Sequence, residues 1–391
     1  MNPRPENSVL DVERAVRERY SKGAAEAEPA LCCPIDYDPR YLAAIPSEVL
    51  ERDYGCGDPS RYVREGDAVL DLGSGGGKIA FIAAQIAGPS GRVVGVDMND
   101  EMLALARRSA PRVAAAIGYD VAGFRRGRIQ DLALDLDLMD AWLRENPVRG
   151  AADLASLDDA AARLRRESPM IPDASIDVVV SNCVLNLVRE DDKPKLLREI
   201  FRVLRPGGRL AISDIVSDEV VPDDLKADAE LWSGCVSGAF QESELLRGLE
   251  RAGFYGVAID RWEGAPFRTV RGIEFRAVTV TARKGKEGPC LEANQAVIYR
   301  GPWKQVEDDD HHVLRRGERA AVCAKTYQIL TSEPYVSEII AVPPHAEIPE
   351  GERKGFDCAR TAPRQPRETK GLDYDATTDA GAACCAPGER C

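Results

Sequence analysis

The sequence predicts an α/β protein with a mostly parallel sheet of about seven strands, followed by a small β-rich module. Apolar runs typical of buried strands alternate with segments of helical periodicity, which is the pattern of βαβ units. The expected strands cover residues 68–72, 92–96, 122–129, 176–180, 208–214, 254–262 and 273–282. The expected helices cover 77–87, 100–110, 190–204, 222–232 and 241–252, and Pro111 is expected to end the second of them.

Four segments are expected along the chain. Residues 1–67 form an N-terminal helical segment that carries thiols, with apolar residues at helical spacing over 8–21. Residues 68–285 form the sheet domain, with an insertion at 132–172 that is rich in Asp, Ala and Arg and could act as a lid. Residues 286–345 form the β-rich module, with strand-like runs at 296–299 and 320–325. The Pro-rich residues 346–391 are expected to be a flexible tail containing cysteines.

Composition and charge favour a cytosolic enzyme that acts on a small molecule. The net charge of −13 and the absence of a basic run argue against a nucleic-acid partner, because phosphate contacts need clustered Lys and Arg. No apolar stretch of about 18 residues and no apolar leader is visible, so neither a membrane span nor a secretory signal is expected. Eleven cysteines in a reducing compartment are better interpreted as binding, redox or catalytic thiols than as a disulfide framework.

A glycine-rich turn follows the first expected strand. The chain runs from the buried residues 69–72 through Gly73, Ser74 and Gly75 into a helix, so its backbone can approach a ligand closely. A dinucleotide fingerprint would have a third glycine or alanine at position 78, where this chain has Lys78. The alternative interpretation is an ordinary turn followed by a helix-capping Asp97.

The turn and Asp97 together resemble the Rossmann-like class I S-adenosylmethionine-dependent methyltransferases. In that superfamily an acidic residue followed by G-x-G ends the first strand, and an acid ending the second strand accepts the ribose hydroxyls. The resemblance implies that Met98 packs on the adenine and that the segment at Ile129 and Gln130 contacts the base edge. The implied cofactor is S-adenosylmethionine, bound by Asp71, Gly73, Ser74, Gly75, Asp97, Met98, Ile129, Gln130 and Asn182.

Three cysteines are expected around the same cleft. Cys183 leaves the carboxyl end of the fourth strand, where ligands of such sheets bind. Cys235 follows the fifth strand in a segment of small residues, and Cys56 lies in a glycine-flanked loop that can fold over the first strand. Each cysteine taken singly is more simply explained as a small buried apolar residue. Together they suggest three sulfurs that converge on one point.

The motifs around these cysteines resemble those of the arsenite methyltransferases. The likeness covers roughly residues 8–260 and rests on YGCG at 54–57, SNCVLNL at 181–187 and LWSGC at 231–235. It implies that Cys56, Cys183 and Cys235 bind trivalent arsenic during turnover. The pair Cys32 and Cys33 resembles the N-terminal thiol element of the family, which joins a disulfide relay, and either sulfur could take that role.

The chemistry of arsenic explains why thiols are needed. Trivalent arsenic is soft and exchanges oxygen ligands for sulfur, as soft metals do. Held by three sulfurs, it keeps a lone pair that can attack a methyl carbon in line with the departing sulfonium sulfur. No general base is needed, and the three histidines, His311, His312 and His345, all lie outside the sheet domain. Because methylation oxidises arsenic, a cellular thiol reductant of the glutathione or thioredoxin type is expected as a partner.

Other interpretations remain open at this point. The acceptor could be arsenite or its thiol conjugates, or another small acceptor such as an organic molecule or a selenium or tellurium species. The chain could instead be an arsenic-binding module with a vestigial cofactor site, although the intact turn and Asp97 argue against this. Cys384, Cys385 and Cys391 either collect arsenite or are idle. Zinc could bind at Cys290, His311, His312 and Cys323, but their spacings of 20 and 10 residues match no standard finger.

Overall fold

The computed structural model describes residues 12–25, 35, 37–52, 54–359 and 362–377. The chain forms two compact units, which span Met1–Gly285 and Lys286–Cys391. None of the described helices is both long and apolar enough to cross a lipid bilayer.

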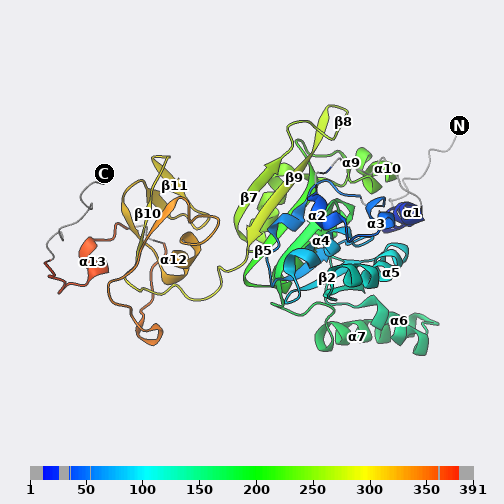
Figure 1. The fold of residues 1–391 in the computed structure, drawn as a ribbon, viewed down its shortest axis with the longest axis horizontal. Helices are drawn as coiled ribbons and strands as arrows, with labels where there is room; N and C mark the ends of the chain where they lie inside the picture. Colours follow the sequence, from blue (N-terminus) through cyan, green and yellow to red (C-terminus); the bar gives the residue numbers. More distant parts are fainter. Residues whose placement is uncertain (1–11, 26–34, 36, 53, 360–361, 378–391) are drawn as a thin grey trace. The chain divides into compact units, whose positions relative to one another are not determined.

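A nine-stranded mixed sheet forms the centre of unit 1 (Figure 1). Its strands run in the order β3-β2-β1-β4-β5-β9-β7, with β6 paired to β5 and β8 paired to β9. Strands β1 to β5 pair in parallel, and β9 joins β5 and β7 antiparallel. The strands are β1 Ala68–Leu72, β2 Arg92–Asp97, β3 Ala122–Arg126, β4 Ile176–Asn182, β5 Leu204–Ser217, β6 Phe240–Gln241, β7 Tyr255–Trp262, β8 Arg268–Val270 and β9 Ile273–Arg283.

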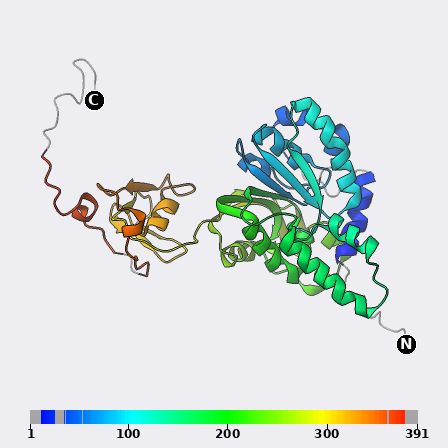
Figure 2. The ribbon, with the colours of Figure 1, turned by 90° about the horizontal axis from the view of Figure 1, so that it is seen from below.

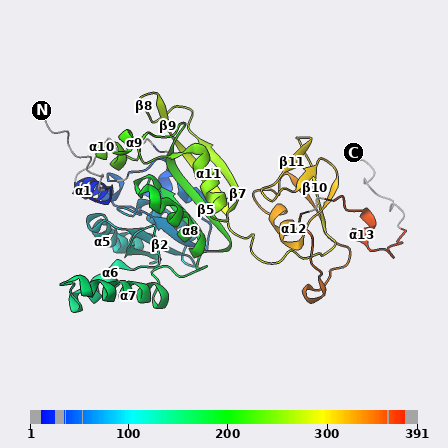
Figure 3. The same ribbon diagram turned by 180° about the vertical axis from the view of Figure 1, so that it is seen from behind.

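Helices cover both faces of this sheet, and successive strand residues supply the two cores. Figure 1 views the face covered by α4, and Figure 3 views the opposite face, covered by α8 and α11. Val69 of β1 packs in the first core and Leu70 in the second, because strand side chains alternate between faces. The helices of unit 1 are α1 Val12–Ala25, α2 Pro39–Leu42, α3 Ser47–Leu50, α4 Lys78–Ala87, α5 Asp100–Ile117, α6 Leu136–Glu145, α7 Ala151–Glu167, α8 Lys193–Val203, α9 Asp223–Lys226, α10 Ala229–Ser233 and α11 Glu242–Arg251.

The seven expected strands are all present, and the mostly parallel α/β sheet is confirmed. The expectation that Pro111 ends a helix was wrong, because α5 continues to Ile117 and stops at Gly118, whose φ is 89°. A proline inside a helix removes one backbone hydrogen bond. The helix nevertheless continues, since Ser109 and Val113 on either side of the exposed Pro111 are buried.

The insertion at 132–172 contains the helices α6 and α7, which pack on each other beside β3 (Figures 1 and 2). Arg165 of α7 bonds to the Asp131 carboxylate at 2.8 Å, which ties the pair to the loop after β3. The helix expected over 8–21 is α1, whose described part runs to Ala25, and residues 8–11 lie outside the described chain.

Unit 2 contains a three-stranded sheet in the order β13-β10-β14 and a separate pair formed by β11 and β12. Its elements are β10 Ala296–Tyr299, β11 Gln305–Glu307, β12 Val313–Arg315, β13 Arg319–Ala321, α12 Ala324–Leu330, β14 Ile339–Val342 and α13 Pro366–Lys370. The strand expected over 320–325 was only partly right, because Cys323 caps the helix α12 there.

The expected flexible tail over 346–391 was wrong for its first part. Gly355 pairs with Leu291, and Pro363 pairs with Ala320 of β13. Arg364, only 7% exposed, forms an ion pair with Glu292 at 2.8 Å. A buried guanidinium needs such a partner, which the local sequence does not reveal. Cys384, Cys385 and Cys391 lie outside the described residues.

The burial of α8 against the sheet leads to a prediction about the free energy of unfolding. Leu196 of α8 is fully buried, so Leu196→Ala should lower the free energy of unfolding by roughly 2–5 kcal/mol through lost burial and a cavity. The matched control is Leu154→Ala in α7, where the leucine is 49% exposed and the change should stay within about 0.5 kcal/mol. Urea unfolding followed by circular dichroism measures both, and equal effects of the two changes would contradict the assigned core.

Candidate functional site

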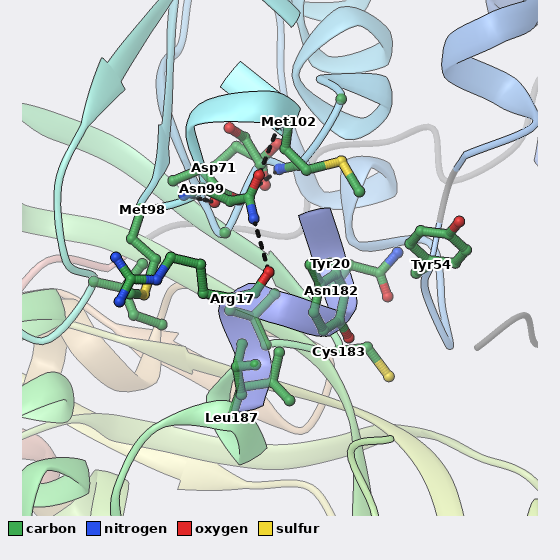
Figure 4. Close-up of a pocket in the computed structure, with 18 of the residues that line it drawn as sticks. Arg17, Tyr20, Tyr54, Asp71, Met98, Asn99, Met102, Asn182, Cys183 and Leu187 are labelled. Atoms are coloured by element: carbon green, nitrogen blue, oxygen red, sulfur yellow. Dashed lines mark hydrogen bonds between the residues drawn. The ribbon is translucent and has the colours of Figure 1, made fainter. Parts of the chain in front are cut away.

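A pocket opens at the carboxyl ends of β1, β2 and β4, which are neighbours in the parallel part of the central sheet. All nine residues expected to bind the cofactor line it, namely Asp71, Gly73, Ser74, Gly75, Asp97, Met98, Ile129, Gln130 and Asn182. Cys183 lines the same pocket (Figure 4). The glycine-rich turn and one of the three predicted thiols therefore share one cavity.

The turn needs glycine at two positions for different reasons. Gly73 has a φ of 64°, and a Cβ there would lie 2.4 Å from a methyl carbon of Val184, so no side chain fits. Gly75 has a φ of 49°, and a Cβ there would meet nothing within 4 Å. The backbone at Gly75 is thus left bare beside open space, which lets a ligand approach it closely.

Asp97 and Ser74 present oxygen atoms in this pocket. The two Asp97 carboxylate oxygens accept hydrogen bonds at 2.8 Å from the backbone N–H groups of Gly75 and Asn99. Burial raises the pKa of Asp97, and these backbone donors oppose that shift. The Ser74 hydroxyl is buried without a hydrogen-bond partner among the described residues. A polar group at this depth usually has a partner, so the pocket fits a ligand with hydroxyl groups, as the ribose of S-adenosylmethionine has.

Helix α1 contributes pocket residues that the sequence did not point to. Arg17 and Tyr20 line the cavity, and Figure 4 shows α1 crossing beside Asn99. Asn99 donates a hydrogen bond to the Ser21 hydroxyl at 3.0 Å, which fixes α1 against the start of α5. The helical periodicity of this segment predicted the helix, but periodicity alone does not say against which surface a helix packs.

The three predicted thiols meet in one buried cluster. Cys56, Cys183 and Cys235 are each at most 8% exposed and belong to the same apolar core. The Cys235 thiol donates to the carbonyl oxygen of Cys183 at 3.1 Å. The Cys56 and Cys183 sulfurs lie within 4.8 Å of each other, whereas the Cys235 sulfur lies outside this set and contacts Cys183 through that carbonyl.

Two of these cysteines have a backbone conformation that non-glycine residues seldom adopt. Cys183 has a φ of 58° and Cys235 a φ of 60°. The left-handed region costs free energy for a residue with a Cβ and persists where the surroundings impose it. At Cys183 the imposing contact is a hydrogen bond from its N–H to the carbonyl of Ser213 at 2.8 Å.

Asn182 holds the loop of Cys56 in place. Its side-chain oxygen accepts from the N–H groups of Cys56 at 2.9 Å and Gly57 at 3.2 Å, and its nitrogen donates to the Gly57 carbonyl at 2.8 Å. A Cβ at Gly55 would lie 2.2 Å from that nitrogen, so the close approach requires glycine. Asn182 was expected to bind the cofactor. It does line the pocket, but its amide atoms are occupied with the Cys56 loop.

The pKa values of two of the three thiols are raised. A hydrogen bond with Cys235 lowers the pKa of Cys183, but a hydrogen bond with Cys56 and burial together raise that pKa well above its usual range. The hydrogen bond with Cys183 and burial likewise raise the pKa of Cys235. Tyr20, whose hydroxyl lies 3.7 Å from the Cys235 sulfur, has its pKa raised mainly by burial.

Asp214, in the second half of β5, was missed by the sequence analysis. One of its carboxylate oxygens lies within 4.8 Å of the Cys56 and Cys183 sulfurs. Its oxygens accept hydrogen bonds from the backbone of Val184, Leu185 and Ile215. Burial raises the pKa of Asp214 to about 6 against the effect of these donors. The available signal was an acid inside a buried apolar strand, as Asp71 is in β1.

Of the five predicted catalytic cysteines, Cys32 and Cys33 lie outside the described residues. Their expected place beside Cys56 therefore stays a prediction.

Comparison with known proteins supports the class of the enzyme. A family profile described as a methyltransferase domain matches residues 64–167 and 165–253, and one described as a domain of unknown function (DUF8838) matches residues 286–374. The crystal structure of an arsenic(III) S-adenosylmethionine methyltransferase from Chlamydomonas reinhardtii superposes with a TM-score of 0.53 at 26% identity. The match covers 82% of this chain and all of that one.

Two curated relatives are similar over most of their length. An arsenite methyltransferase of Aquipseudomonas alcaligenes is 32% identical, over 81% of this chain and 86% of the relative. The arsenite methyltransferase of Homo sapiens is 26% identical, over 90% of this chain and 88% of the relative. With the glycine turn, the acid after β2 and the three clustered thiols in place, this chain belongs to the arsenite methyltransferase family of S-adenosylmethionine-dependent enzymes.

Proposed function

We propose that this enzyme transfers methyl groups from S-adenosylmethionine to trivalent arsenic held by Cys56, Cys183 and Cys235. One observation carries the proposal: Cys183 lines the cofactor pocket, its sulfur lies within 4.8 Å of the Cys56 sulfur, and its carbonyl accepts a hydrogen bond from the Cys235 thiol. An acceptor bound by this thiol therefore lies at the wall of the pocket that holds the methyl donor.

Neutral thiols suit arsenous acid as a substrate. Each Sγ–H proton leaves with an arsenic-bound hydroxyl as water, so three thiols replace three hydroxyls without releasing a proton to solvent. The raised pKa values of Cys183 and Cys235 therefore do not oppose binding. A divalent metal ion, in contrast, requires thiolates, which this apolar cluster disfavours. The site is thus selective for a neutral thiophilic species.

The described arrangement needs no proton acceptor for the methyl transfer. The arsenic lone pair points away from the three sulfurs and carries no proton, and the histidines of the chain all lie in unit 2. Bound S-adenosylmethionine supplies an electrophilic methyl carbon on its sulfonium sulfur. The protein aligns the lone pair with that carbon and excludes water through the buried residues around Cys183.

Reduction completes the cycle. Methyl transfer oxidises arsenic by two electrons, and two thiols that form one disulfide return them. We place Cys32 or Cys33 in this step as the partner of Cys56, with a cellular thiol of the glutathione or thioredoxin type reducing the resulting disulfide.

Replacement of Cys183 tests the shared thiol. Cys183→Ser should abolish methylarsenic formation and weaken arsenite binding at least about tenfold, because a hydroxyl is a poor ligand for a soft centre. Activity is measured by speciation of the arsenic products formed from arsenite, S-adenosylmethionine and a thiol reductant. Calorimetry measures the affinities for arsenite and for S-adenosylmethionine. Retained S-adenosylmethionine affinity is the internal control for folding. Normal arsenic methylation by this variant would refute the proposal and favour a different acceptor chemistry.

Asn182 should act through Cys56. Asn182→Ala removes the hydrogen bonds that hold the 54–57 loop, so arsenite affinity should fall about tenfold, while S-adenosylmethionine affinity changes less. Asn146→Ala, at the exposed end of α6, is the matched control and should behave as the wild type. A larger loss in cofactor affinity than in arsenite affinity would show that Asn182 serves the cofactor instead.

The proton balance predicts the pH dependence. Because the pKa values of Cys183 and Cys235 lie well above their usual range, both thiols stay neutral between about pH 7 and about pH 8.5. Arsenite affinity should therefore be nearly constant over this interval in direct binding titrations. A roughly tenfold rise for each pH unit would mean that binding releases one proton to solvent, contrary to the proposed condensation.

A further inference from the structure

Unit 2 contains a second cluster of three thiols, far along the chain from the first. The sulfurs of Cys290, Cys323 and Cys358 all lie within 4.8 Å of one another. Cys290 begins the unit and Cys323 caps α12. Cys358 is brought in because Phe356 donates a backbone hydrogen bond to the Cys290 carbonyl at 2.8 Å. Three sulfurs that meet at one point are better suited to a soft ion than to a disulfide, which would use only two.

The Cys323 sulfur has the surroundings of a metal-binding thiolate. It accepts a hydrogen bond from the backbone N–H of Thr326 at 3.3 Å, and the Thr326 hydroxyl lies 3.2 Å away. Donors directed at a sulfur stabilise its anionic form. This differs from the active-site cluster, where the thiol of Cys183 is kept neutral.

A buried histidine accompanies this cluster. His312 is 2% exposed, and its Nδ1 lies 2.8 Å from the Asp308 carboxylate. Its Nε2 is buried and has no hydrogen-bond partner within the described chain. With Nδ1 donating to Asp308, Nε2 carries a lone pair, and a carboxylate behind the far nitrogen is the usual support of a metal-binding histidine.

The segment of His312 packs in the same core as the segment of Cys323. Leu314, two residues after His312, and Val322, the chain neighbour of Cys323, belong to one apolar cluster. The three sulfurs lie within 4.8 Å of one another, and Nε2 does not belong to this set. To share one ion, the ring and the thiols must therefore move toward each other. The adjacent His311 differs completely, because its side chain is 86% exposed and bonds to Glu307.

A bound ion would stabilise unit 2, because the apolar core of this unit is small. Its apolar core contains only seven fully buried members, around a sheet of three short strands. Small cores of this kind commonly need a cross-link or a metal for stability. An ion at these residues would join the start of the unit, the turn before β12, the cap of α12 and the segment after residue 355.

We propose that unit 2 binds one Zn²⁺ ion through the sulfurs of Cys290, Cys323 and Cys358 and through Nε2 of His312. Four donors of this kind match the tetrahedral preference of structural zinc. Trivalent arsenic takes three sulfurs and would leave the buried imidazole nitrogen unpaired, so zinc accounts for more of the observed groups. The site is separate from the methyl-transfer site and does not depend on the function proposed for it.

Metal analysis of the full-length protein, purified without chelators, tests the proposal directly. We expect about one zinc per chain. Co²⁺ exchanged into the protein should give the intense visible bands of tetrahedral coordination together with thiolate charge-transfer bands. Protein that contains no zinc and gives no such cobalt spectrum would overturn the proposal. Arsenite bound at these three cysteines in place of zinc, detected by arsenic X-ray absorption as a three-sulfur shell, would overturn it as well.

Two adjacent histidines provide a matched pair of variants. His312→Gln should lower zinc affinity at least about tenfold in competition with a chromophoric chelator, whereas His311→Gln should match the wild type. Cys358→Ser, at a partly exposed position that is less critical for folding, should also lose zinc. Equal zinc retention by the wild type and His312→Gln would overturn the assignment of the fourth ligand. Full retention by Cys358→Ser would overturn the site.

Discussion

The last residues of β4 determine the whole active site. The side-chain amide of Asn182 forms hydrogen bonds with the Cys56 loop. Cys183 follows the strand, and its N–H donates a hydrogen bond to the Ser213 carbonyl. The carboxylate of Asp214 on the neighbouring strand binds the backbone immediately after Cys183. Because β4 lies beside β1, the same strand end also borders the glycine turn. One strand terminus thus couples cofactor pocket and acceptor thiols.

The surroundings of Cys183 differ in polarity between its two sides. Toward β1 and β2 the pocket offers backbone N–H groups, the Asp97 carboxylate and the Ser74 hydroxyl. Toward β5 the thiols lie among apolar residues such as Ile215 and Val236, with the Asp214 carboxylate beside Cys56 and Cys183. Under the proposed function, the polar side would receive the cofactor and the thiol side would receive the arsenic species.

Most of the sheet could be predicted from the sequence because buried strands alternate with helices of clear periodicity. The cofactor residues and the meeting of three thiols were accessible as well, since the carboxyl ends of parallel strands share one edge. The position of α1 could not be predicted from the sequence, because its contacts through Ser21 and Tyr20 are made with residues far along the chain. The role of Asn182 and the place of Asp214 likewise depend on hydrogen bonds that only the folded chain creates.

Unit 2 was harder to predict for a related reason. The sequence analysis considered zinc at Cys290, His311, His312 and Cys323 but disfavoured it, because their spacing matched no standard finger, and Cys358 was overlooked. The missing information is the pairing of Gly355 with Leu291, which returns a distant segment to the start of the unit. Such long-range pairing has no local signature, and the same is true of the buried Arg364 beside Glu292.

The left-handed backbone at Cys183 and Cys235 has an evolutionary consequence. Glycine adopts this conformation without strain, so replacement of either cysteine by glycine would relieve a cost that the reactive sulfur imposes. A lineage no longer exposed to arsenic would therefore have an easy route to a sturdier but inert protein.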